Sequence, residues 1–183
     1  ISSNLPNGDM LFNSISASFN YGEKSAIIGN NGVGKTTLFS ILSGKTNPTS
    51  GNIDKQAAMA FLQQNVSAQK GEIAEVLGIK KIVEALDKIE GGDFDEKLYD
   101  IIGQNWDIKS VAEKLLTDLN VYKHLSDRFE YLSGGEKEKI LLAKMFLSEA
   151  DILLFDEPTN NLDYQSKQKF YQMVLETSKG VVI

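Results

Sequence analysis

The fold is decided by the stretch Gly29-Asn30-Asn31-Gly32-Val33-Gly34-Lys35-Thr36, which fits the phosphate-binding pattern G-x-x-x-x-G-K-[ST]. Glycines in such a loop allow main-chain N–H groups to close around phosphates. We expect a strand before the loop, over 24–28, and a helix after it, over 36–43, whose positive dipole end faces the anion. A chance match to the pattern is expected about once in a hundred chains of this length, and this context makes it rarer. The stretch therefore predicts a site for the phosphates of a nucleotide.

A second acidic segment supplies what such a site needs. Lys35 is expected to reach the β- and γ-phosphates, and the Thr36 hydroxyl is expected to bind Mg²⁺. The metal also needs a carboxylate at the end of a buried strand. Asp156 follows Ile152–Phe155, an apolar run that is typical of a parallel strand covered on both faces. Glu157 comes next, where a base could polarise an attacking water. Taken alone, Asp-Glu would be better interpreted as an exposed acidic turn, but the phosphate loop requires such a partner.

Hydrophobic periodicity divides the chain into three stretches. Helical spacing dominates residues 71–131, whereas strands and helices alternate before and after them. The pattern predicts one α/β domain, made of residues 1–70 and 132–183, with a helical subdomain at 71–131 inserted into it. Further elements are expected at 57–62 (strand), 137–148 and 164–177 (helices) and from Val181 (strand). The chain lacks a starting Met, and we expect the domain to be truncated at both ends.

Composition excludes several classes of protein. The 183 residues are 42% apolar and 24% charged, which is ordinary for a globular protein. The sequence has no run of the roughly 18 apolar residues that a membrane span needs, and its start does not resemble a signal peptide. The chain has no cysteine, which excludes disulfides and thiolate metal sites and fits a cytoplasmic location. A net charge of −6 argues against direct nucleic-acid binding by this domain.

Two further stretches resemble motifs of ATP-binding cassette (ABC) proteins. Leu132-Ser133-Gly134-Gly135-Glu136 is similar to the LSGGQ signature, and Asp156-Glu157-Pro158-Thr159-Asn160-Asn161-Leu162-Asp163 resembles the Walker B motif, catalytic glutamate and D-loop. With the phosphate loop, these motifs stand in the family order from end to end of the chain. The resemblance implies an α/β P-loop NTPase fold: a mostly parallel sheet, an inserted α-helical subdomain and an N-terminal β edge. It also implies Mg²⁺-dependent ATP hydrolysis across a head-to-tail dimer of two cassettes.

The resemblance also implies a role for each matching residue. Glu157, Lys35 and Gln64 would be catalytic. Gln64 would be the Q-loop glutamine that contacts Mg²⁺ or the attacking water, and Gln63, one step away, is the alternative. The Mg²⁺ ligands would be Thr36, Gln64 and Asp156. The residues expected to bind ATP are Gly29, Asn30, Asn31, Gly32, Val33, Gly34, Lys35, Thr36 and Thr37, together with Ser133, Gly134, Gly135, Glu136 and Asp163.

The signature also has a physical reason of its own. The Ser133 hydroxyl and the N–H groups of Gly134 and Gly135 lie at the expected start of a helix, which favours binding of a second anion. One chain would therefore carry two half-sites for a triphosphate. In the family these halves meet between two domains.

The chain departs from the family pattern at two places. The family's switch histidine would lie beyond Ile183, so we expect weak hydrolysis by this chain alone. His124 precedes the signature and is expected to be solvated or to cap a helix. The aromatic residue that stacks on adenine would fall near positions 6 and 7, where the chain has Pro-Asn. Phe12 and Tyr21 are nearby, and we expect each to contribute core or edge packing instead.

The motif sequences resemble those of the F subfamily, whose members are proteins with two cassettes in one chain, many acting on the ribosome. These sequences are Gly-Asn-Asn-Gly at residues 29–32, Ser-Gly-Gly-Glu-Lys at 133–137 and Glu-Pro-Thr-Asn-Asn-Leu-Asp at 157–163. Residues 105–108 also resemble that subfamily. This implies a second cassette and the ribosome as partners. The alternative is the ATPase subunit of a membrane transporter, which would dock a membrane subunit. A degenerate cassette that serves as a scaffold is disfavoured, because the catalytic residue types are present.

Overall fold

The computed structural model describes residues 1–62 and 69–183. By its internal contacts the chain divides into two compact units, which we describe separately. The sheet unit consists of Ile1–Gln64, Ser148–Asn160 and Tyr171–Ile183, and the helical unit consists of Asn65–Leu147 and Asn161–Phe170. The domain boundaries expected from the sequence, at 70/71 and 131/132, stay predictions.

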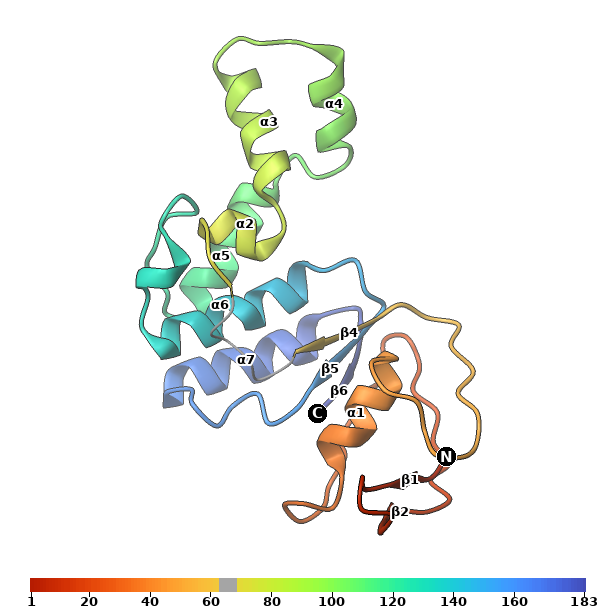
Figure 1. Ribbon diagram of the computed structural model, residues 1–183. Coiled ribbons are helices and arrows are strands. Elements are labelled where there is room, and N and C mark those ends of the chain that lie inside the picture. Colours follow the sequence, from red (N-terminus) through yellow and green to blue (C-terminus); the bar gives the residue numbers. More distant parts are fainter. Residues whose placement is uncertain (63–68) are drawn as a thin grey trace. The chain divides into compact units, whose positions relative to one another are not determined.

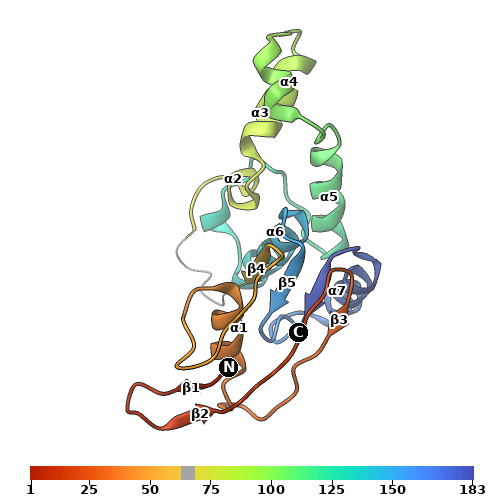
Figure 2. The same ribbon diagram turned by 90° about the vertical axis from the view of Figure 1, so that its right-hand side faces the viewer.

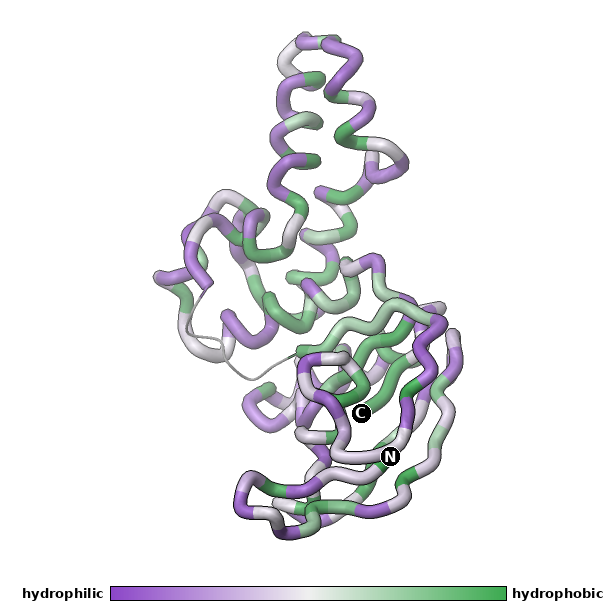
Figure 3. The backbone as a smooth tube through the Cα atoms, turned by 45° about the vertical axis from the view of Figure 1, so that its right-hand side comes forward, coloured by the Kyte–Doolittle hydropathy of each residue, from purple (hydrophilic) through white to green (hydrophobic). Residues whose placement is uncertain are grey.

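A parallel four-stranded sheet forms the sheet unit (Figures 1 and 2). Its strands lie in the order β3 (Lys24–Ser25), β6 (Gly180–Val182), β5 (Ile152–Phe155) and β4 (Met59–Leu62). Ile152 pairs with Met59 on one side and with Gly180 on the other, and every neighbouring pair of strands is parallel. All four residues of β5 are buried, and Figure 3 shows hydrophobic residues along these strands. The prediction of a parallel strand at 152–155 is confirmed.

Helix α1 (Lys35–Ser43) packs against β4 and β5 of this sheet. Its inward side chains are Leu38, Phe39 and Leu42, which cluster with Ile152, Leu154 and Val182. The Phe39 ring stacks on the Phe61 ring of β4 with 5.8 Å between the centroids. The helix ends at Gly44, whose φ of 82° places it in the left-handed region that closes helices. The predicted strand–loop–helix order is therefore confirmed.

The N-terminal segment forms a small antiparallel pair, β1 (Ser3–Asn4) and β2 (Met10–Phe12), which is the expected N-terminal β edge. The strand before the phosphate loop is shorter than expected, because it covers Lys24–Ser25 rather than 24–28. The Ile27 N–H still donates to the Ile183 carbonyl oxygen at 2.7 Å, but Ile28 is 94% exposed. Its apolar character therefore does not reflect burial in the sheet.

The helical unit is built from short helices, and α3 and α4 lie side by side in it (Figure 1). The α3–α4 contact is filled by Ala85, Leu86, Leu98 and Ile102. The elements are α2 (Ile73–Leu77), α3 (Lys80–Glu90), α4 (Glu96–Ile102), α5 (Ile108–Asp118), the 3₁₀ turn η2 (Phe129–Tyr131) and α6 (Gly134–Leu147). Helix α7 (Tyr164–Glu176) begins in this unit and ends in the sheet unit. None of the helices in the described part of the chain combines the length and apolar composition needed to cross a membrane.

Leu154 provides a test of the sheet core. Its side chain is fully buried in β5, so Leu154→Ala should lower the free energy of unfolding by about 2–5 kcal/mol, through lost apolar burial and the cavity left behind. Leu175→Ala is the matched control, since Leu175 is 75% exposed and its loss should change stability by less than about 0.5 kcal/mol. Urea unfolding measures both variants, and equal effects would contradict the assignment of the core.

Candidate nucleotide site

The phosphate loop leads directly into α1, and its backbone requires glycine at Gly34. This residue has a φ of 103°, and an added Cβ would lie 2.9 Å from Leu11 Cγ and 3.0 Å from Phe12 Cδ1. Strand β2 is therefore packed against the loop, which the sequence alone did not indicate. Gly34 is also the N-cap of α1 and has no side chain to cap it, so the first N–H groups of the helix can serve an anion.

Lys35 is held over the loop by the loop's own carbonyl groups. Its Nζ donates to the Gly29 carbonyl oxygen at 2.8 Å and to the Asn30 carbonyl oxygen at 3.3 Å. The same Nζ lies 3.9 Å from Glu157 Oε1, and the Lys35 side chain is 16% exposed. The ammonium group is thus placed between the loop and the acidic turn that follows β5.

Thr36 and Asp156 meet although they are 120 residues apart in the sequence. The Thr36 hydroxyl donates to Asp156 Oδ2 at 2.5 Å. Asp156 is 8% exposed and directly follows β5, as expected. A hydroxyl and a carboxylate fit Mg²⁺, which prefers oxygen ligands and keeps water and phosphate in its remaining positions. No cluster of three or more His, Cys, Asp or Glu that could hold a metal occurs among residues 1–62 and 69–183.

Glu157 stands in an uncommon backbone conformation beside this pair. Its φ is 51°, a left-handed value that costs a non-glycine residue on the order of 1–3 kcal/mol and that occurs often at functional sites. Its side chain is 38% exposed. Oε2 accepts a hydrogen bond of 2.7 Å from the Asn160 side chain, a contact that the motif analysis did not foresee. A partly exposed carboxylate next to a phosphate loop and an ammonium group has the placement of a general base.

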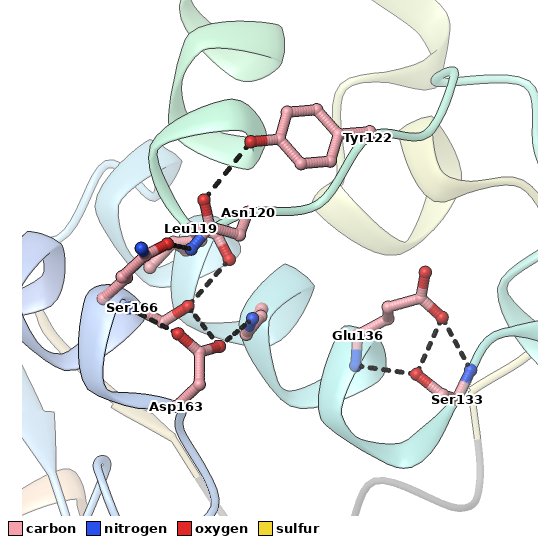
Figure 4. Close-up of polar contacts among 9 residues, drawn as sticks. Leu119, Asn120, Tyr122, Ser133, Glu136, Asp163 and Ser166 are labelled. Atoms are coloured by element: carbon pink, nitrogen blue, oxygen red, sulfur yellow. Dashed lines mark hydrogen bonds and ion pairs between the residues drawn. The ribbon is translucent and has the colours of Figure 1, made fainter.

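The signature stretch begins α6 with a capping box (Figure 4). The Ser133 N–H and hydroxyl donate to Glu136 Oε2 at 2.9 and 2.7 Å, and the Glu136 N–H donates back to the Ser133 hydroxyl at 3.3 Å. These bonds lower the pKa of the Glu136 carboxyl, with help from Lys123 at 3.6 Å. Where the family signature has glutamine, this chain therefore has an ionised carboxylate that caps the helix.

Asp163 is also engaged within the helical unit (Figure 4). Its Oδ2 lies 2.6 Å from Lys139 Nζ and 2.8 Å from the Ser166 hydroxyl, and its Oδ1 accepts the Ser166 N–H at 2.9 Å. The Ser166 hydroxyl is also 3.1 Å from the Leu119 carbonyl oxygen. The Lys139 ammonium, followed by the Ser166 donors, holds the pKa of Asp163 far below its ordinary value. Asp163 thus ties the first turn of α7 to α6, and its expected role toward ATP stays a prediction.

The structure brings four expected residues together in the sheet unit: Lys35, Thr36, Asp156 and Glu157. Ser133, Gly134, Gly135, Glu136 and Asp163 belong to the helical unit. Gln64, with its alternative Gln63, lies outside the described residues.

His124 is exposed, as expected, and its backbone N–H donates to Asp127 Oδ2 at 2.9 Å. Phe12 packs against the core, also as expected, whereas Tyr21 is 63% exposed and is not part of the core.

The sheet order, the phosphate loop that begins α1 and the acidic residue after β5 define the class of P-loop NTPases. Solved structures support the fold. One entitled "Structure of ATP binding subunit of ABC transporter" is similar with a TM-score of 0.68 over 99% of this chain and 75% of that chain, at 19% identity. A structure of "RNase-L Inhibitor" has a TM-score of 0.63 and 27% identity over 90% of this chain and 29% of its own.

The particular family follows from the sequence comparison. The model of the family described as "ABC transporter" matches residues 12–160, and the chain belongs to this family as one of its ATPase domains. It is 33% identical to the ABC transporter ATP-binding protein YfmM of Bacillus subtilis over 85% of this chain and 35% of that protein. The chain therefore spans about a third of that relative.

Two other relatives differ in what their names say they do. Energy-dependent translational throttle protein EttA of Mycobacterium tuberculosis is 28% identical over 87% of this chain and 32% of its own length. Lipoprotein-releasing system ATP-binding protein LolD of Idiomarina loihiensis is 28% identical over 86% of this chain and 70% of its own length. The family thus includes relatives named for translation and for transport.

Lys139→Met tests the electrostatics around Asp163. Removing the nearby ammonium group disfavours the charged carboxylate, so the pKa of Asp163 should rise toward its ordinary value. A carboxyl with a depressed folded-state pKa stabilises the folded state above its unfolded pKa of about 3.9, and this stabilisation is lost as the pH falls. The variant lacks part of this stabilisation from the outset, so it should lose less stability on acidification. A carboxyl-carbon NMR titration measures the pKa, with Lys137→Met as the control. An unchanged pKa would contradict the ion pair.

Proposed function

We propose that this chain binds ATP with Mg²⁺ and hydrolyses it by phosphoryl transfer to water. The observation that carries the proposal is the convergence of four side chains at one edge of the sheet. The Thr36 hydroxyl lies 2.5 Å from the Asp156 carboxylate, and the Lys35 ammonium lies 3.9 Å from the Glu157 carboxylate. A phosphate loop, two oxygen ligands, a cation and a candidate base are together the parts that this reaction requires.

Each part has a distinct chemical task. The backbone N–H groups of residues 29–37 would bind the phosphates, and Lys35 would offset negative charge that develops on the γ-phosphate. Thr36 and Asp156, together with Gln64, would hold Mg²⁺, which when bound neutralises charge on the phosphate oxygens. Glu157 would orient the attacking water or accept its proton.

The proposed partner is a second cassette. Ser133, Gly134, Gly135 and Glu136 stand at the N-terminus of α6, and with Asp163 they would complete the ATP site of an opposing cassette in a head-to-tail dimer. The helix dipole and the Ser133 hydroxyl favour binding of a phosphate there. The capping box suggests that Ser133 would exchange its bond to Glu136 for one to the phosphate.

We further propose that the chain is one cassette of a cytoplasmic F-type protein that acts on the ribosome. The wording of its motifs and the similarity to EttA support this role. Because the net charge is −6, we expect contact with ribosomal protein rather than direct nucleic-acid binding by this domain. The alternative is the ATPase subunit of a membrane transporter, favoured by the match over 70% of LolD. A second cassette in the same gene would favour the F type, and a single cassette would favour the transporter.

Glu157→Gln tests the assignment of the base. The amide keeps the shape of the side chain but cannot accept the proton, so ATP affinity should persist while turnover falls by about 100-fold or more. The variant should also accumulate as an ATP-bound dimer. Steady-state ATPase assays, calorimetry and size-exclusion chromatography of the intact protein measure these quantities. Retained turnover would reject Glu157 as the base.

Lys35→Ala provides the contrasting variant. The ammonium group should contribute to binding of the phosphates before any chemistry, so this variant should lose nucleotide affinity together with turnover. Tight ATP binding by Lys35→Ala in the same calorimetric assay would reject the role of Lys35.

A further inference from the structure

Asn160 contacts the candidate base through a tight turn. Its side-chain Nδ2 donates to Glu157 Oε2 at 2.7 Å, and its backbone N–H donates to the Glu157 carbonyl oxygen at 3.3 Å. Pro158 is the second residue of this four-residue turn, where its fixed φ is favourable. The turn therefore returns Asn160 to Glu157, and both residues belong to the sheet unit.

The two oxygens of the Glu157 carboxylate have different neighbours. Oε2 accepts the Asn160 amide, whereas Oε1 lies 3.9 Å from Lys35 Nζ. A glutamate side chain that is 38% exposed would otherwise sample several rotamers, and fixing it carries an entropic cost. A hydrogen bond to a charged acceptor is stronger than one between neutral groups, so the amide can fix this orientation.

We propose that Asn160 is a positioning residue for Glu157, which it holds with Oε2 occupied and Oε1 directed toward the side of the phosphate loop. The inference rests on the proposed ATPase function. An amide suits the task because it donates a hydrogen bond without gaining or losing a proton near neutral pH. The adjacent residue, Asn161, donates instead to Glu138 of α6 at 2.7 Å, so the two neighbouring asparagines have different partners.

The first test separates catalysis from binding. In the intact protein, Asn160→Ala should lower kcat by about tenfold or more, because a misoriented base is inefficient, while the Kd for ATP changes by less than about twofold. Asn160→Gln retains the amide and should restore part of the lost kcat. Asn47→Ala, which alters an exposed asparagine in the loop after α1 of the same unit, is the matched control and should leave kcat unchanged. An unchanged kcat in Asn160→Ala, or an equal loss of ATP affinity, would overturn the proposal.

The second test asks whether Asn160 acts through Glu157. In the Glu157→Gln background, Asn160→Ala should change the residual single-turnover rate by less than about twofold, because the carboxylate to be oriented is already absent. A general structural role would instead lower the rate in both backgrounds by the same factor, and that result would overturn the proposal.

A third readout requires no turnover and separates this inference from the ATPase proposal. The Asn160 side-chain amide signals in a nitrogen–proton NMR spectrum should move when Glu157→Ala removes the acceptor, and an unmoved signal would overturn the contact. If Glu157→Ala shifts the Asn160 signals but the wild-type protein hydrolyses no ATP, the contact stands. The proposed function is then overturned, and the positioning role with it.

Discussion

The contact on which the site depends joins the Thr36 hydroxyl to the Asp156 carboxylate at 2.5 Å. It exists because β5 is paired in parallel with β4 and β6 and because α1 packs on β4 and β5. In an open α/β sheet, ligands bind outside the carboxyl ends of the strands, and here the residue that follows β5 meets the first turn of α1 at such an edge. Burial of apolar side chains in the sheet unit thus fixes the distance between the two proposed metal ligands.

In the helical unit, polar contacts organise the two segments that match the family motifs. Ser133 and Glu136 satisfy each other at the start of α6. Lys139, one turn further along α6, is joined to Asp163 at the start of α7. Helix α6, which the signature stretch begins, is therefore joined to Asp163 by the Lys139 ion pair, while the backbone hydrogen bonds of Glu136 and Asp163 stay within the start of their own helices. A motif that is read as a set of ligands is here also a set of helix caps.

Local patterns predicted much of this structure. Two signals are features of consecutive residues and are therefore visible in the sequence: the glycine spacing of residues 29–36 and the apolar run of β5. For this reason the loop, the helix α1 and the placement of Asp156 could be expected from sequence. The predicted strand before the loop was longer than the observed one, because the apolar character of Ile28 does not reveal whether its side chain is buried. The packing of Leu11 on Gly34 and the bond between Asn160 and Glu157 depend on how the backbone turns, and residue type alone does not specify that.

Calorimetric titration of the intact protein with ATP, in Mg²⁺ and again in excess chelator, tests most directly whether the loop and the β5 carboxylate together hold a metal–nucleotide complex. The account predicts saturable binding that is tighter in Mg²⁺, and it predicts that Asp156→Asn loses this gain while it remains folded. Well-folded wild-type protein that takes up no ATP, or takes it up equally well in both buffers, would contradict the account.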